Sequence, residues 1–129
     1  MRRLIEETLA AGFLDGDADG IGLAAMDDGA ALRVADGWLV VTTDSHVVHP
    51  IFFPGGDIGR LAVAGTVNDL AMMGGTNILG LTSAVVIEEG FRQSDLERIQ
   101  RSMQDTCREA GTTIVTGDPK VMGRGELDG

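Results

Sequence analysis

Acidic side chains recur at four places in the sequence. They are the pair Asp27 and Asp28, then Asp44, Asp69 and Asp118. Mg²⁺ prefers carboxylate and phosphate oxygens as ligands. Lys120, the only lysine of the chain, supplies a point charge for a phosphate or a proton donor. These residue types favour Mg–nucleotide chemistry, although the sequence contains neither a P-loop nor a G-x-G-x-x-G motif.

The composition limits the possible partners and the compartment. The 129 residues suit a single domain, 1–129, and the net charge of −10 argues against nucleic acid and anionic membranes as partners. No apolar run approaches the roughly 18 residues of a membrane span, and no signal peptide is recognised. A single cysteine excludes an internal disulfide and a Cys-rich metal site. We therefore expect a cytoplasmic protein.

Residues 61–75 are predicted to form the helix that positions Asp69. The stretch is apolar on almost every side, which is typical of a buried helix, yet Asn68 and Asp69 lie in its middle. A buried carboxylate is costly without a metal, a cation or hydrogen-bond donors. Alternatively, Asp69 caps a neighbouring loop or faces water. Asp57 is the predicted N-cap of this helix, and Gly74 its predicted stop.

A hairpin is predicted to position Asp44. Its strands are 31–35 and 38–44, and the Asp36-Gly37 pair is a strong two-residue turn signal. Asp44 lies where the second strand ends, and ligands often bind at strand ends and the loops that follow. As an alternative, Asp44 is only a cap or turn residue.

Two other patterns resemble metal sites, and we interpret both as structural. His46 and His49 could share a metal only on a helix, which Pro50 disfavours, so we expect hydrogen-bonded or surface histidines. Residues 15–20 resemble the start of an EF-hand calcium loop, but Met26 stands where a bidentate glutamate belongs. A solvated acidic turn is therefore favoured over a calcium-binding module.

The second half of the chain alternates strands and helices. A strand is predicted over 78–88, and a helix follows to Ala110, opened by a capping box from Ser94 to Glu97. A short strand over 112–116 is predicted to end at the Gly-Asp-Pro-Lys stretch. The irregular alternation favours an α+β fold over a doubly wound sheet. The helix carries an apolar stripe that marks Cys107 as a core residue rather than a nucleophile: Leu96, Ile99, Met103, Cys107 and Ala110.

Several motifs together resemble the HypE family of hydrogenase maturation proteins. This family is related to aminoimidazole ribonucleotide (AIR) synthetase, thiamine-phosphate kinase and selenophosphate synthetase. The Asp-Asp, Thr-Asp, Asn-Asp and Gly-Asp elements are shared across that superfamily, whereas the Phe-Phe-Pro-Gly-Gly-Asp stretch and the Glu-Glu-Gly turn indicate HypE. The motifs occupy residues 27–32, 43–45, 52–59, 65–71, 87–90 and 114–121.

The resemblance implies a PurM-like N-terminal domain, with a mixed sheet, helices on one face and sheet-to-sheet dimerisation. Proteins of this family bind Mg–ATP near the dimer interface. They dehydrate a carbamoylated C-terminal cysteine to a thiocyanate, whose cyanide goes to the iron of nickel–iron hydrogenase. The implied partners are a second copy of the chain, the carbamoyltransferase HypF and the HypC–HypD scaffold complex.

The resemblance also implies a role for each candidate residue. Mg²⁺ and phosphates are assigned to Asp27 or Asp28, Asp44, Asp69 and Asp118. Asn68 and Gly117 line the nucleotide, and Lys120 neutralises charge or assists proton transfer. Another ATP-dependent enzyme of the superfamily, a kinase or a selenophosphate synthetase, is the alternative.

Three departures from the family pattern affect these expectations. Pro119 replaces the usual threonine and removes a backbone donor. The glycine-rich segment that usually precedes the first helix is absent. The second domain and its terminal cysteine are also missing, so we expect a chain truncated at its C-terminal end, inactive alone, that forms the ATP-binding and dimer-forming half of a longer enzyme.

Overall fold

The structure is a computed structural model that describes residues 1–14 and 19–127. The chain divides into two compact units. The first comprises Met1–Thr43 and Asn68–Thr76, and the second comprises Asp44–Val67 and Asn77–Gly129. Residues 15–18, which hold most of the predicted acidic turn that resembles a calcium loop, lie outside the described residues.

The first unit begins with a helical segment. Helix α1 (Arg2–Leu4) continues into a π-helical turn, η1 (Ile5–Leu9), and the segment closes near Gly12, whose φ is +83°. Ion pairs between residues four apart, Arg2–Glu6 and Arg3–Glu7, follow its surface.

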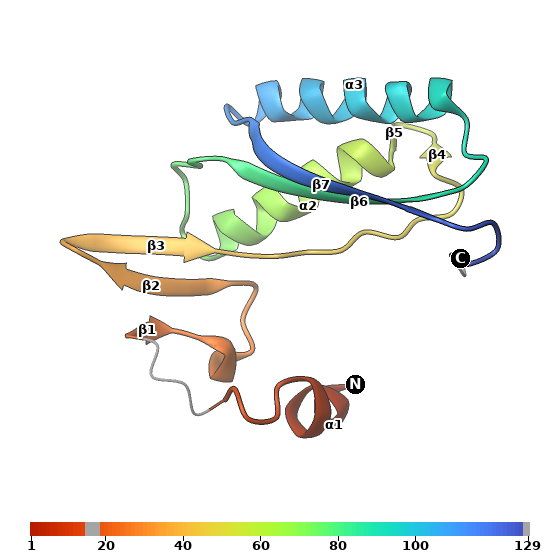
Figure 1. Ribbon diagram of the computed structural model, residues 1–129. Coiled ribbons are helices and arrows are strands. Elements are labelled where there is room, and N and C mark those ends of the chain that lie inside the picture. Colours follow the sequence, from red (N-terminus) through yellow and green to blue (C-terminus); the bar gives the residue numbers. More distant parts are fainter. Residues whose placement is uncertain (15–18, 128–129) are drawn as a thin grey trace. The chain divides into compact units, whose positions relative to one another are not determined.

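The predicted hairpin forms the centre of a three-stranded antiparallel sheet in the order β1-β2-β3 (Figure 1). Its strands are β1 (Gly20–Ile21), β2 (Ala30–Val34) and β3 (Gly37–Val41), and a short 3₁₀ turn, η2 (Leu23–Ala25), follows β1. Val34 pairs with Gly37, so the loop is Ala35-Asp36, one residue earlier than predicted. Ala35, the first residue of this loop, has a positive φ of +46°.

Helix α2 (Ile58–Met72) is the predicted central helix. A small hairpin of β4 (Phe52–Phe53) and β5 (Gly56–Asp57) leads into it, and the buried Asp57 caps it by accepting a hydrogen bond from the Arg60 N–H at 3.0 Å. Gly74, with a φ of +81°, follows its end, as predicted.

The expectation that α2 is buried along its length is wrong for this chain. Only Gly59 and Val63 are buried; Asn68 is exposed, Asp69 is half-buried, and Met72 is 75% exposed. The described part of the chain is too small to cover both ends of an almost wholly apolar helix.

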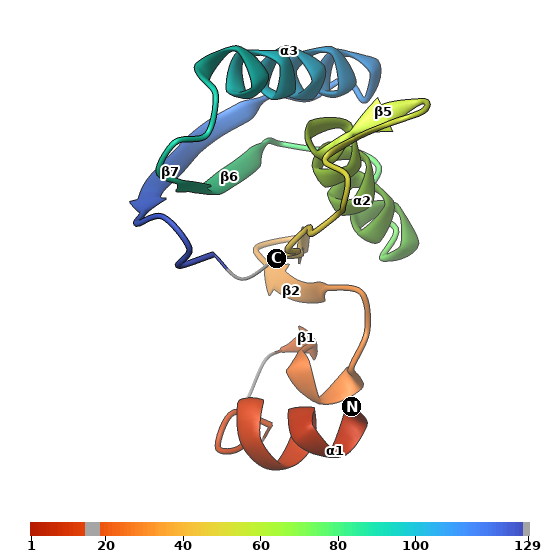
Figure 2. The ribbon, with the colours of Figure 1, turned by 90° about the vertical axis from the view of Figure 1, so that its right-hand side faces the viewer.

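The second unit is built on a β-α-β arrangement. Strands β6 (Leu81–Glu88) and β7 (Ile114–Met122) pair in parallel, and α3 (Gln93–Glu109) connects them along one face (Figures 1 and 2). The predicted strand end at Gly117 is wrong: the Gly-Asp-Pro-Lys stretch continues β7. Pro119 is tolerated because β7 is an edge strand. A register shift between Leu81 and Thr82 interrupts the pairing of β6 with β7 near the start of β6.

Helix α3 contributes buried side chains to the core of the second unit. Met103 and Cys107 are buried on its apolar stripe, as predicted for Cys107, and the neighbouring Thr106 is also buried. Helix α2 approaches closely at Gly59, where a Cβ would lie 2.6 Å from the Ile99 carbonyl oxygen. The end of α3 is a Schellman motif with Gly111 at a φ of +68°. Its Thr112 N–H donates to the Cys107 carbonyl.

The predicted capping box is wrong. The helix begins at Gln93, so Ser94 already lies in its first turn, and its N-cap, Arg92, makes no side-chain capping bond. Gln93 instead donates to the Glu97 carboxylate at 2.9 Å.

The α+β class is confirmed, but a single mixed sheet is not observed. Among the described residues, the antiparallel and parallel pairings lie in three separate sheets. In the same part of the chain, every helix is too short or too polar to span a bilayer.

Candidate functional site

The Asp27–Asp28 pair lies in the turn before β2, in the first unit. Both side chains are exposed, and the Asp28 N–H donates to Asp27 Oδ1 at 3.0 Å. The Thr42 hydroxyl donates to the Asp28 carbonyl at 2.8 Å, which ties this turn to the residue after β3. The backbone of the pair is therefore held while its carboxylates stay accessible.

Asp69 belongs to the same unit as this pair. A Cβ on Gly29 would lie 3.2 Å from Met73 Cγ, so the residue after Asp28 packs against the end of the helical segment. The Met73 N–H donates to the Asp69 carbonyl, and residues four apart share one face of a helix. Asp69 and Met73 therefore lie on the same side of this helical segment.

Asp44 lies in the second unit, just after β3, and two residues contact its carboxylate. The Ser45 N–H donates to Oδ1 at 2.8 Å, and His46 Nε2 lies 3.0 Å from Oδ2. The Asp44 side chain is 34% exposed, whereas that of His46 is only 13% exposed. The Nε2–Oδ2 contact is an ion pair when the imidazole is protonated.

Gly117, Asp118 and Lys120 lie on β7, also in the second unit. Residues two apart on a strand share a face, and Lys120 Nζ lies 2.9 Å from Asp118 Oδ2 and 3.1 Å from Oδ1. Both side chains are about two-thirds exposed. A Cβ on Gly117 would lie 2.7 Å from the Ser83 carbonyl oxygen, so β6 and β7 require glycine there.

The donor chemistry of these residues fits a magnesium–phosphate group better than a metal held by protein alone. No group of three or more His, Cys, Asp or Glu side chains suited to a metal occurs among residues 1–14 and 19–127. Mg²⁺ is usually held by one or two carboxylates, with phosphates and waters completing its shell. Exposed carboxylates such as those of Asp28, in the first unit, and Asp118, in the second, are the donor type that such a group needs.

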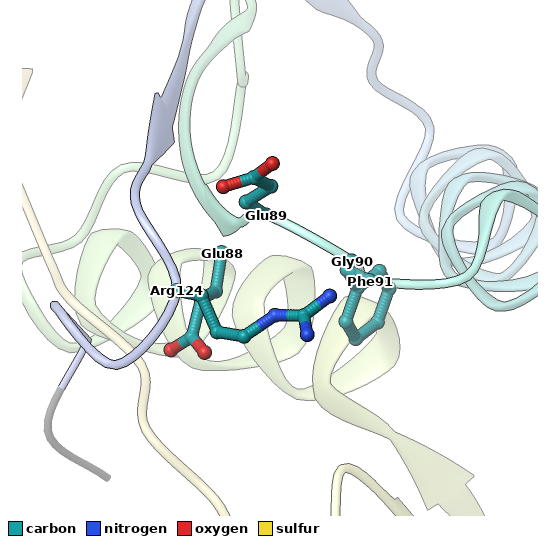
Figure 3. Close-up of a pocket in the computed structure, with 5 residues that line it drawn as sticks. All are labelled: Glu88, Glu89, Gly90, Phe91 and Arg124. Carbon is teal, nitrogen blue, oxygen red and sulfur yellow. The ribbon is translucent and has the colours of Figure 1, made fainter.

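A shallow hollow of about 430 Å³ lies elsewhere in the second unit, at the Glu-Glu-Gly turn (Figure 3). The Arg124 guanidinium extends toward Gly90 and Phe91, while the Glu89 carboxylate points away. Glu88 accepts a hydrogen bond from the Gly125 N–H at 3.0 Å. Nothing in the sequence indicated that Arg124 and Phe91 line a hollow. Gly90 has a positive φ of +94°, and the only sequence signal for this conformation was the residue type, glycine. None of the predicted site residues lines this hollow.

Cys107 is unsuited to nucleophilic chemistry. Its side chain is buried in the core, and burial raises the pKa of the thiol. A nucleophilic cysteine needs thiolate character, which this environment opposes.

Residues 26–128 match the N-terminal domain of the AIR synthase related proteins. The chain belongs to this family. It is 53% identical over 107 residues to the carbamoyl dehydratase HypE of Rhizobium leguminosarum bv. viciae, covering 83% of this chain and 30% of that protein. The sequence resemblance to the HypE family is thereby confirmed.

Two solved structures share this fold. A HypE–HypF complex matches with a TM-score of 0.77 and 46% identity, over 97% of this chain and 38% of that one. HypE in complex with ATP matches with a TM-score of 0.65 and 44% identity, over 98% of this chain and 36% of that one. The chain thus spans about a third of the length of the HypE proteins it matches.

Proposed function

We propose that this chain is the Mg–ATP-binding N-terminal half of a HypE-like carbamoyl dehydratase. The observation that carries the proposal is the likeness to HypE in complex with ATP, which extends over 98% of this chain at 44% identity. The 53% identity to a carbamoyl dehydratase favours HypE over the kinases and selenophosphate synthetases of the superfamily.

In this proposal the candidate carboxylates serve the metal and the phosphates. Mg²⁺ neutralises phosphate charge, which makes phosphoryl transfer easier. Asn68 and Gly117 line the nucleotide. The candidate ligands of Mg²⁺ are Asp27 or Asp28, Asp44, Asp69 and Asp118.

Lys120 is the proposed catalytic residue. Its ammonium group is held by Asp118 on the same face of β7, and it is exposed enough to exchange that partner for a phosphate oxygen. Three N–H donors allow it to keep one bond to Asp118 while it contacts a phosphate. Lys120 would thus neutralise charge or move a proton during the dehydration.

The full-length enzyme would remove water from an S-carboxamide on a C-terminal cysteine, with ATP hydrolysis, and leave a thiocyanate. The cyanide would then serve the iron of nickel–iron hydrogenase. We propose a cytoplasmic homodimer that works with HypF, consistent with the solved HypE–HypF complex, and with the HypC–HypD complex. Exposed apolar side chains on β6 and β7, Val86 at 51% and Val121 at 72%, support a sheet-to-sheet interface.

Calorimetric titration of the full-length protein with ATP tests the proposal. We expect binding that requires Mg²⁺ and disappears with EDTA. Lys120→Ala should weaken it roughly 10- to 100-fold, since a bond to a charged group contributes about 1.5–3 kcal/mol. Arg101→Ala, which removes one exposed positive charge from α3, is the matched control and should change little. Absence of ATP binding, or binding indifferent to Mg²⁺, would contradict the proposal.

A further inference from the structure

We propose that His46 is a positioning residue that fixes the Asp44 carboxylate for Mg²⁺. The inference rests on the proposed function, because it takes Asp44 as a metal ligand. It adds a residue that the motif resemblance left without a role.

The contacts of the pair define the geometry. His46 Nε2 lies 3.0 Å from Asp44 Oδ2, and the Ser45 N–H holds Oδ1 at 2.8 Å. A nitrogen that faces a carboxylate oxygen at this distance is favourable there only when it carries a hydrogen. In the proposed role Nε2 carries that hydrogen, so it is not free to bind a metal itself.

This arrangement leaves Asp44 oriented but not saturated. An ionised carboxylate offers about four lone-pair positions, and the two donors take one on each oxygen. The remaining positions are open to a cation on the exposed part of the group. Ordering the carboxylate in advance lowers the entropy that metal binding must otherwise remove.

Helix α2 supplies the space for this histidine. A Cβ on Gly65 would lie 2.5 Å from His46 Nε2 and 3.5 Å from Asp44 Oδ2. Only glycine at this position of the helix lets the ring lie against the helix backbone and still reach the carboxylate. The His46 side chain is only 13% exposed because the ring packs against the helix at this position.

The test is a Mg²⁺ titration of the full-length protein at fixed ATP, followed by the thermal shift. His46→Leu and His46→Gln have similar volumes, but only the glutamine places an N–H donor near the position of Nε2. His49→Ala is the control, since His49 is the other histidine and is exposed. The ligand-free melting temperature of each variant reports any purely structural loss.

We expect His46→Leu to raise the Mg²⁺ midpoint roughly 10- to 100-fold, the usual cost of losing a partner of a metal ligand. His46→Gln should restore the wild-type midpoint to within about threefold, and His49→Ala should leave it unchanged. An unchanged midpoint in His46→Leu would overturn the inference. Equal midpoints in the leucine and glutamine variants, both raised, would also overturn it, because packing rather than the hydrogen bond would then matter.

These outcomes differ from failure of the proposed function. A wild-type protein without any Mg–ATP shift would contradict Mg–ATP binding itself. A wild-type shift that Asp44→Asn leaves intact would remove Asp44 from the metal site, and with it the role of His46.

Discussion

Helices α2 and α3 differ in how much of their surface this chain covers. Helix α3 has a charged face and a narrow apolar stripe; Met103 and Cys107 on that stripe are buried, and so is the neighbouring Thr106. Helix α2 is far more apolar, yet only Gly59 and Val63 are buried. Apolar composition thus shows that a helix must be covered, but not that its own chain covers it. The open end of α2 is also the end that carries Asn68 and Asp69.

The largest expected difference between the helices is in core stability. Met103→Ala should lower the free energy of unfolding by about 2–5 kcal/mol, because it leaves a cavity in a buried site. Met72→Ala, at a side chain 75% exposed, should change it by no more than about 0.5 kcal/mol. Denaturant unfolding of both variants measures this. A large loss in Met72→Ala in the full-length protein would show that another part of that protein covers α2.

Thiol reactivity provides a second comparison. Cys107 is buried and burial raises the pKa of its thiol, so a thiol reagent should modify it far more slowly than an exposed cysteine. Met72→Cys adds a second thiol at the open end of α2, and its labelling should be fast. Time-resolved labelling with mass spectrometry separates the two sites. Equal rates would contradict the burial of the α3 stripe.

The smallest expected effect concerns the ion pair between the helices. Arg60 donates to both carboxylate oxygens of Glu109, at 3.1 and 2.8 Å, and this hydrogen bond and the Arg60 charge lower the pKa of Glu109. A lowered pKa stabilises the folded state above the unfolded pKa of Glu109, about 4.3. This stability is lost as the pH falls through the folded pKa.

Arg60→Gln should therefore destabilise slightly at neutral pH and not at all at strongly acidic pH. Unfolding midpoints at several pH values, with Arg101→Gln as the control, measure the effect. A loss from Arg60→Gln that persists in acid would indicate packing rather than the charge of Glu109.

The sequence predicted the elements whose signals are local. Asp57 as a cap, the helix end at Ala110 and the stripe around Cys107 each depend on a few neighbouring residues, and all three are confirmed. The predicted capping box was wrong because Ser94 fits either the N-cap or the first turn of a helix. Which of these positions it takes depends on where the helix begins, and this helix begins at Gln93.

Non-local pairing explains the other failures. The Gly-Asp-Pro-Lys stretch has weak strand propensity, but its ladder with β6 keeps β7 continuous to Met122. For the candidate site, residue type and motif suggest the carboxylates and Lys120, and these assignments stay predictions. The partners of these side chains were not predictable. The Lys120–Asp118 pair depends on the continuity of β7, and the His46–Asp44 contact depends on the space that Gly65 leaves.

The most direct test of Mg–ATP binding is a thermal melt of Asp69→Asn in the full-length protein, with and without Mg–ATP. Asparagine keeps the shape of the side chain but loses the charge that a divalent ion needs. Ligand at about 100 times its dissociation constant should stabilise the wild type by about 2.7 kcal/mol. We predict that Asp69→Asn loses this shift with its ligand-free melting temperature unchanged or raised, while the exposed turn variant Asp36→Asn retains the shift. A full Mg–ATP shift in Asp69→Asn would contradict the assignment of Asp69 as a metal ligand.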